Sequence, residues 1–94
     1  MKSKSTYKIP NGKLLKIFLD YNEKNQLINN IKITGDFFAY PEEAIEKMEN
    51  ELKNTKLDKN ILNEKIKNII QENDIEFIGL NSEGLTNGIL ICLK

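Results

Sequence analysis

The first third of the chain alternates between apolar and polar residues, and a period of two is typical of half-buried β-strands. The alternation is clearest over residues 13–22, where one predicted face holds Leu15, Ile17, Leu19 and Tyr21. Residues 5–9 form an earlier alternating segment, and the two segments are joined by Pro10-Asn11-Gly12-Lys13. Because Asn-Gly is among the strongest short hairpin signals, we expect an antiparallel pair of strands here.

A third strand is predicted over residues 27–34, after a polar turn. Strict alternation gives it a buried face made of Leu27, Ile31 and Ile33, with Ile28 on the opposite face. The three strands would then form an antiparallel meander. Its outward face is more apolar than usual for a free surface, because it contains Leu14, Phe18 and Ile28.

Three helices are predicted after the strands, from apolar residues at helical spacing. Pro41 is the predicted first residue of a helix that ends near Asn54. Asp58 is the predicted N-cap of the second, which stops around residues 72–74 and has an apolar stripe of Ile61, Leu62, Ile66, Ile69 and Ile70. The third begins at Asn81 or Ser82 and places on one side Leu85, Ile89, Cys92 and Leu93.

Residues 75–80 are ambiguous, because six residues are too few for periodicity to separate a fourth short strand from an apolar connector. We favour the connector. Strands followed by helices predict an α+β fold, in which a three-stranded antiparallel meander is covered on one face by two to three helices. No repeat or linker interrupts the sequence, so residues 1–94 are predicted to form a single domain, with residues 1–4 frayed.

Charge and apolar run lengths narrow the function classes. The 94 residues have no net charge, because 14 acidic residues balance 14 basic residues. Every basic residue is a lysine. A dedicated nucleic-acid binder usually has an excess of positive charge, so we expect no nucleic-acid partner. The apolar runs at residues 37–40 and 89–93 are far shorter than the about 20 residues that span a bilayer, so no membrane segment is expected.

The absence of His and the single Cys remove the commonest general base and any Cys-rich metal site or internal disulfide. A reducing cytoplasm is the expected compartment. At this length, folding buries only roughly 60% of the surface that the unfolded chain exposes, which leaves little margin for strained catalytic geometry. A self-sufficient enzyme is therefore not expected.

The most distinctive stretch is residues 35–43, where Gly-Asp leads into three aromatic residues and then into Pro-Glu-Glu. In a structural interpretation, Gly35 adopts a conformation closed to other residues, Asp36 caps the turn, and the aromatic side chains fill the seam between sheet and helix. Alternatively the stretch is a contact surface for another protein, since clustered aromatics beside acidic residues are typical interface anchors. The candidate interface residues are Lys13, Gly35, Asp36, Phe37, Phe38, Tyr40 and Pro41.

Other polar and reactive residues have simpler interpretations. Lys13 either presents its ammonium group to an anionic partner or is a solvated turn residue. Glu42, Glu46 and Glu49 follow the spacing of one helix face, so a solvated surface is expected there and not a catalytic cluster. Cys92 has no His beside it in the sequence and is expected to be a buried structural thiol.

Residues 8–14, a strand, residues 31–43 and residues 45–52, in this order, resemble the C-terminal domain of lipoate protein ligases, and the resemblance covers essentially the whole chain. The resemblance is strongest to the separately encoded small subunit of bipartite ligases from archaea and some bacteria. Gly35-Asp36-Phe37-Phe38 followed by Tyr40-Pro41-Glu42-Glu43 is its most specific part, whereas beyond Asn54 only the helical pattern matches. The family usually has two glycines before the lysine, and here Asn11 precedes Gly12.

This resemblance implies a fold similar to the iron-sulfur scaffold proteins of the SufE and NifU type, and a non-catalytic accessory role. A large catalytic subunit would hold lipoate, ATP and Mg, form lipoyl-AMP, and transfer the lipoyl group to a lipoyl-domain protein such as glycine cleavage H protein or a 2-oxoacid dehydrogenase acyltransferase. The small chain would bind no cofactor alone and would support the adenylation step. Residues 35–41 and the Lys13 turn would then face the large subunit.

A second interpretation is a small interaction or scaffold domain of the iron-sulfur assembly fold type. Such a domain would not bind a cluster, because clusters require several thiolates and Cys92 is the single cysteine.

Overall fold

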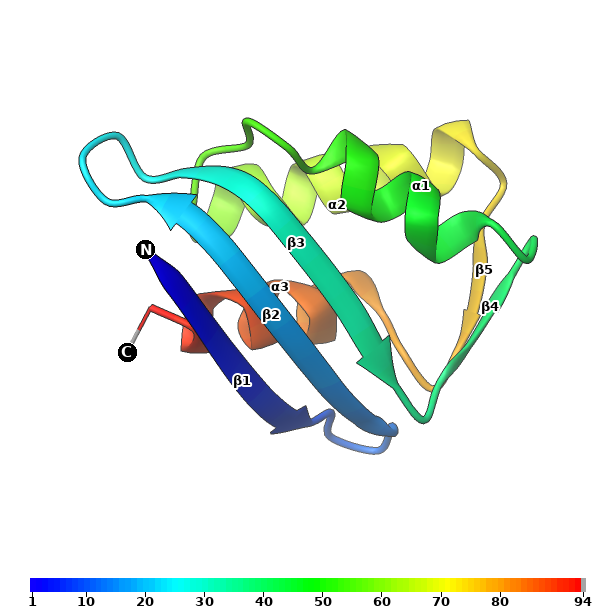
Figure 1. The fold of residues 1–94 in the computed structure, drawn as a ribbon. Coiled ribbons are helices and arrows are strands. Elements are labelled where there is room, and N and C mark those ends of the chain that lie inside the picture. The colour runs from blue at the N-terminus through cyan, green and yellow to red at the C-terminus, as the bar shows by residue number, and fades with distance from the viewer. Residues whose placement is uncertain (94) are drawn as a thin grey trace.

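The computed structural model describes residues 1–93, and its first three strands form one antiparallel sheet. β1 (Lys2–Lys8) pairs with β2 (Leu14–Asn22), which pairs in turn with β3 (Leu27–Gly35). Figure 1 shows this sheet in front of the helices. The predicted α+β fold with an antiparallel meander is confirmed. Lys94, the last residue of the predicted single domain, lies outside the described residues.

The expectation that residues 1–4 are frayed is wrong. Lys2 pairs with Asp20 and Lys4 with Phe18. The Met1 ammonium group donates a hydrogen bond of 3.0 Å to the Tyr21 carbonyl oxygen, and the Tyr21 N–H donates one of 2.9 Å to the Met1 carbonyl oxygen. The long strand β2 therefore offers a backbone partner to each of the first residues.

A β-bulge at the start of β3 corrects the predicted faces of this strand. The register pairs Asp20 with Asn30 but Tyr21 with Ile28, so Asn29 is the extra residue. As a result Ile28 is fully buried and Leu27 is half-buried, the reverse of the strict alternation. The segment after α1 uses the backbone of Ile28, whose carbonyl oxygen accepts a bond of 2.7 Å from the Asn54 N–H.

Three helices follow the sheet: α1 (Ala44–Glu51), α2 (Lys59–Glu72) and α3 (Ser82–Ile91). The predicted caps are confirmed, because Asp58 Oδ2 accepts from the Ile61 N–H at 3.1 Å and Asn81 Oδ1 accepts from the Gly84 N–H at 2.6 Å.

The predicted bounds of the first helix were wrong at both ends. Pro41 lies in a turn, and its carbonyl oxygen accepts a hydrogen bond of 2.9 Å from the Ala44 N–H. The helix therefore starts three residues later, at Ala44. At the other end, the positive φ of 66° at Asn54 is incompatible with a continued right-handed helix.

The favoured connector at residues 75–80 contains a strand. β5 (Glu76–Ile78) pairs antiparallel with β4 (Phe38–Tyr40), and together they form a separate two-stranded sheet. We call this pair the β4–β5 ribbon. In Figure 1 it lies at the right-hand end of the molecule, whereas the N-terminus lies at the left.

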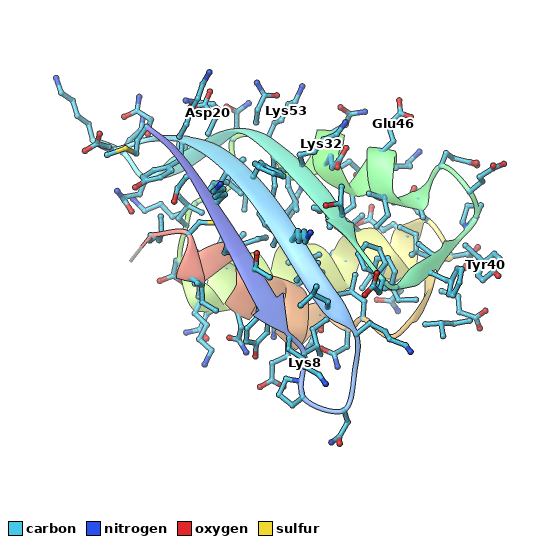
Figure 2. The ribbon with its side chains drawn as sticks, turned by 60° about the horizontal axis from the view of Figure 1, so that its bottom comes forward. Lys8, Asp20, Lys32, Tyr40, Glu46 and Lys53 are labelled. Atoms are coloured by element: carbon cyan, nitrogen blue, oxygen red, sulfur yellow. The ribbon has the colours of Figure 1, made fainter. Side chains whose placement is uncertain are left out.

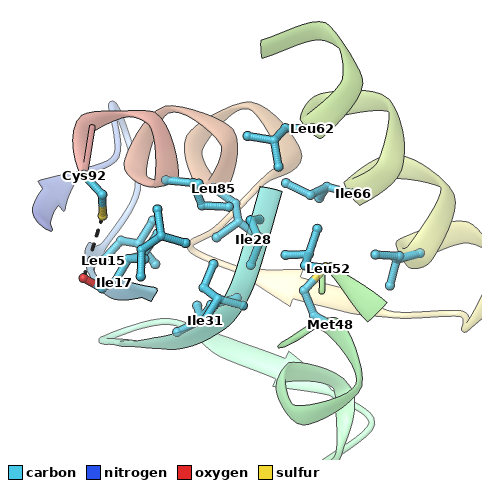
Figure 3. Close-up of a cluster of buried hydrophobic side chains, with 14 of the residues drawn as sticks. Leu15, Ile17, Ile28, Ile31, Met48, Leu52, Leu62, Ile66, Leu85 and Cys92 are labelled. Carbon is cyan, nitrogen blue, oxygen red and sulfur yellow. Dashed lines mark hydrogen bonds between the residues drawn. The ribbon is translucent and has the colours of Figure 1, made fainter. Parts of the chain in front are cut away.

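The helices cover one face of the sheet and enclose the core. Figure 3 shows side chains from the sheet meeting those of all three helices in one cluster. Its fully buried members include Leu15, Ile17, Ile28, Met48, Leu52, Leu62, Ile66 and Leu85. Burying each side chain of this size contributes about 1.5–3 kcal/mol to folding. Gly88 permits the close approach of α3 to β2, since a Cβ there would lie 2.7 Å from a methyl carbon of Leu15.

Two serine hydroxyls of β1, one buried and one half-buried, hydrogen-bond to the C-terminal part of α3. Ser5 Oγ donates to the Gly88 carbonyl oxygen at 2.8 Å, and Ser3 Oγ donates to the Cys92 carbonyl oxygen at 2.6 Å. No helix within residues 1–93 is both long enough and apolar enough to cross a membrane.

Candidate functional site

The β4–β5 ribbon presents apolar side chains to solvent. Phe38 is 63% exposed, Tyr40 is 53% exposed, and Ile78 is 50% exposed. The register pairs Phe38 with Ile78 and Tyr40 with Glu76, and directly paired residues point to the same side of an antiparallel ribbon. These four side chains therefore form one continuous outer face, in which three apolar groups adjoin one carboxylate.

The inner side of the ribbon anchors it to the rest of the molecule. Ala39 and Phe77 are paired there and are partly buried against the core. The ring of Phe37 meets that of Phe77 edge to face, with centroids 6.4 Å apart and planes at 85°. The ribbon is thus held from within while its outer face stays open.

Gly35 and Asp36 direct the chain from β3 into the ribbon. A Cβ on Gly35 would collide with the carbonyl oxygen of Leu14, so no larger residue fits without a backbone shift. The same oxygen accepts a hydrogen bond of 3.0 Å from the Asp36 N–H. Asp36 thus fixes this turn through its backbone, and its side chain is exposed.

The Lys13 turn lies beside the same end of the ribbon, because Gly79 follows Ile78, the residue that pairs with Phe38. The Lys13 N–H donates to the Gly79 carbonyl oxygen at 3.1 Å, directly after β5. Gly79 has a φ of +85°, and a Cβ there would lie 2.5 Å from Lys13 Cγ and 3.7 Å from Phe37 Cβ. This glycine allows the hairpin and the aromatic segment to meet.

The structure therefore brings the predicted interface residues together at one end of the molecule. Lys13, Gly35, Asp36 and Phe37 form the base of the ribbon, while Phe38 and Tyr40 lie on its outer face. Pro41 is exposed in the turn to α1. Figure 2 shows Tyr40 at this end.

Glu76 and Ile78 complete the outer face and were not among the candidate residues predicted from the sequence. The burial of β5 alternates as a strand requires, with Phe77 turned inward, but the residue types do not, because Glu76 is followed by two apolar residues. Three residues are too short a run for this alternation to stand out, and the partner strand lies far away in the sequence.

The predicted solvated face of α1 has one exception. Glu42, Glu43 and Glu46 are exposed, but Glu49 is half-buried, and its Oε2 accepts a hydrogen bond of 2.7 Å from the Ile33 N–H. Its carboxylate therefore has a structural role at the edge of the sheet.

Cys92 is the buried thiol that the sequence predicted. Burial raises its pKa above the ordinary value, and Figure 3 shows its weak contact of 4.0 Å with the Ile17 carbonyl oxygen. Within residues 1–93, no group of three or more His, Cys, Asp or Glu side chains is placed to hold a metal ion.

Comparison with known proteins gives two matches of nearly full length. The family described as bacterial lipoate protein ligase C-terminus matches residues 6–89. A chain from the structural analysis of an archaeal lipoylation system, the bi-partite lipoate protein ligase and its E2 lipoyl domain from Thermoplasma acidophilum, superposes with a TM-score of 0.79 and 26% sequence identity. This match covers 95% of the present chain and 94% of the other. No curated protein matches.

Proposed function

The chain belongs to the bacterial lipoate protein ligase C-terminus family, and on that premise we propose that it is the non-catalytic accessory subunit of a lipoate protein ligase. It acts with a separate catalytic subunit that activates lipoate with ATP and Mg²⁺ to give lipoyl-AMP. The lipoyl group then passes to a lysine of a lipoyl-domain protein, of the glycine cleavage H protein or 2-oxoacid dehydrogenase acyltransferase type.

The observation that carries this proposal is the match, along nearly the whole length of both chains, to a chain from the analysis of a bi-partite lipoate protein ligase. In a ligase of two parts, the part without the reacting groups acts through the surface that it presents. This chain has no His and a single buried Cys, so a role through contact suits its composition better than a role in bond making.

The surface that we assign to the catalytic subunit is the outer face of the β4–β5 ribbon. Its aromatic and aliphatic side chains are large, exposed and adjacent, which is typical of the centre of a protein interface. Because Phe37 and Phe77 anchor the ribbon from within, docking orders few additional side chains and costs little conformational entropy.

The proposed effect on the reaction is positional. A rigid ribbon that packs against the catalytic subunit stabilises the arrangement in which lipoate and ATP are enclosed together. Enclosure excludes water and strengthens the electrostatic interactions that favour adenylate formation.

The test is lipoate-dependent pyrophosphate release from ATP by the cognate catalytic subunit, with and without this chain. We expect release from the mixture at a rate at least about tenfold above that of either chain alone. Equal rates with and without this chain, from a catalytic subunit shown to bind lipoyl-AMP, would contradict the proposal. The chain would then be interpreted as a small interaction or scaffold domain of the iron-sulfur assembly fold type.

A further inference from the structure

The outer face of the three-stranded sheet is a second distinctive surface, and the proposed function does not use it. Its exposed lysines come from all three strands: Lys2, Lys4, Lys8, Lys16 and Lys32. We call this surface the lysine face. Figure 2, in which the strands lie in front of the helices, labels Lys8 and Lys32 on it.

The positive charge of the lysine face is balanced only in part by nearby carboxylates. Asp20 is the one acidic residue among the outward-facing positions of the sheet, and its carboxylate already lies 3.8 Å from the Met1 ammonium group. That is the single salt bridge within residues 1–93. Since the whole chain has no net charge, the compensating carboxylates lie elsewhere on the molecule. Positive charge is thus concentrated on the outer face of the sheet, and the rest of the molecule has an excess of negative charge.

An exposed aromatic ring stands at the centre of the lysine face. Phe18 is 51% exposed and pairs with Lys4 on one side and Lys32 on the other. It separates two shallow depressions of about 480 and 340 Å³. The larger is lined by residues that include three lysines and two acidic residues, Lys2, Lys32, Lys53, Asp20 and Glu49. The smaller is lined by residues that include Lys4 and Lys16.

We infer that the lysine face docks an acidic surface of the protein acceptor that receives the lipoyl group, an inference that rests on the proposed function. The charge complement of five lysines is a cluster of carboxylates, and an exposed ring among them suits a protein surface with an apolar spot. A nucleic acid is disfavoured, because the acidic remainder of this neutral chain repels a long polyanion.

The character of the two surfaces decides which partner each one takes. The β4–β5 ribbon has adjacent apolar groups and suits a lasting contact. The lysine face has one largely exposed apolar side chain, Phe18, among solvated charges, which favours fast association and ready release. An acceptor must leave after every transfer, whereas the catalytic subunit remains.

The experiment uses the assembled complex of this chain with the catalytic subunit and measures two rates. One is lipoate-dependent pyrophosphate release without acceptor, and the other is kcat/KM for transfer of the lipoyl group to the acceptor domain. The test variant is the double substitution Lys4→Glu and Lys32→Glu. Its matched control is Lys65→Glu with Lys67→Glu, the same change of charge at exposed positions of α2.

We expect the test variant to lower kcat/KM for the acceptor about tenfold at low salt, with the loss shrinking as ionic strength rises. Pyrophosphate release and the thermal midpoint should stay within about twofold and a few degrees of the unchanged complex. The variant Phe18→Ala should lower kcat/KM without changing its salt dependence.

Three results would overturn the inference. The first is equal transfer by the test and control variants. The second is loss of complex formation or pyrophosphate release in the test variant, which would assign the lysine face to the catalytic subunit. The third is competition for this face by duplex DNA or RNA at physiological salt. A failure of the wild-type chain to stimulate pyrophosphate release would instead contradict the proposed function.

Discussion

The carboxylate of Glu49 accepts a hydrogen bond of 2.7 Å from the backbone N–H of Ile33, and it thereby fastens α1 to the open edge of β3. An edge strand presents unpaired N–H and carbonyl groups that invite pairing with other chains. Farther along the same edge, the Ile28 N–H donates to the Thr55 carbonyl oxygen at 3.0 Å. Side chain and loop together cover an edge that a meander leaves open.

Replacing Glu49 should therefore destabilise the fold. We expect Glu49→Ala to lower the free energy of unfolding by about 1.5–3 kcal/mol, because the bond joins a charged acceptor to a backbone donor. Urea denaturation followed by circular dichroism measures the change. The control is Glu46→Ala on the exposed side of the same helix, which should change it by less than about 0.5 kcal/mol. Equal effects would show that the bond contributes nothing.

A side chain at Gly35 should disturb the turn into the ribbon. Because a Cβ would collide with the Leu14 carbonyl oxygen, Gly35→Ala should lower the free energy of unfolding by about 2–4 kcal/mol. The neighbouring change Asp36→Ala should have little effect on stability, since Asp36 contributes its backbone N–H to this turn. Thermal unfolding of both variants is the measurement, and an undisturbed midpoint for Gly35→Ala would mean that the backbone relaxes at no cost.

The outer face of the β4–β5 ribbon should matter for binding more than for folding. Phe38→Ala and Ile78→Ala should each weaken the complex with the catalytic subunit about tenfold, while the thermal midpoint of the isolated chain changes little. Isothermal titration calorimetry gives the dissociation constants. Ile61→Ala is the matched control, because Ile61 is a 49% exposed aliphatic residue on α2. Equal losses for all three variants would remove the ribbon from the interface.

Cys92 should be unreactive in the folded chain and should couple stability to alkaline pH. Burial raises its pKa, so the folded state keeps its proton at pH values where the unfolded state has lost it. The unfolded state then binds fewer protons, and the free energy of unfolding falls as the pH rises above the usual thiol pKa of about 8.5.

Two measurements test this behaviour. Reaction with a thiol reagent at pH 8 should be slow in buffer and fast in urea. Denaturation at pH 7 to 10 should show a steeper alkaline loss of stability in the wild-type chain than in Cys92→Ala. Parallel pH profiles for the two proteins would contradict the assignment to this thiol.

The sequence was sufficient to predict the elements whose signals are local. The alternation of apolar and polar residues in β2 extends over nine residues. Asp58 and Asn81 mark the starts of two helices, because the side chain of each accepts a hydrogen bond from the backbone N–H three residues later. Such signals need no knowledge of the rest of the chain.

Features that depend on distant partners escaped prediction. β4 and β5 have three residues each and exist because they pair with one another across α1 and α2. The bulge beside Ile28 pairs this residue with Tyr21, and the segment after α1 uses its backbone. The candidate site was accordingly half predicted: residues 35–41 and the Lys13 turn were named as candidate contacts, but neither β4 nor β5 was predicted as a strand.

The position of the N-terminus at the end opposite the ribbon limits how this chain can be joined to its partner. The molecule is 34 Å long, so a single-chain fusion through Met1 that leaves the ribbon docked needs a linker able to cross that length. In fully extended form this takes roughly ten residues, and a flexible Gly/Ser linker needs several times more, since its mean span grows with the square root of its length. A shorter tether would pull the partner away from the face that it is meant to contact.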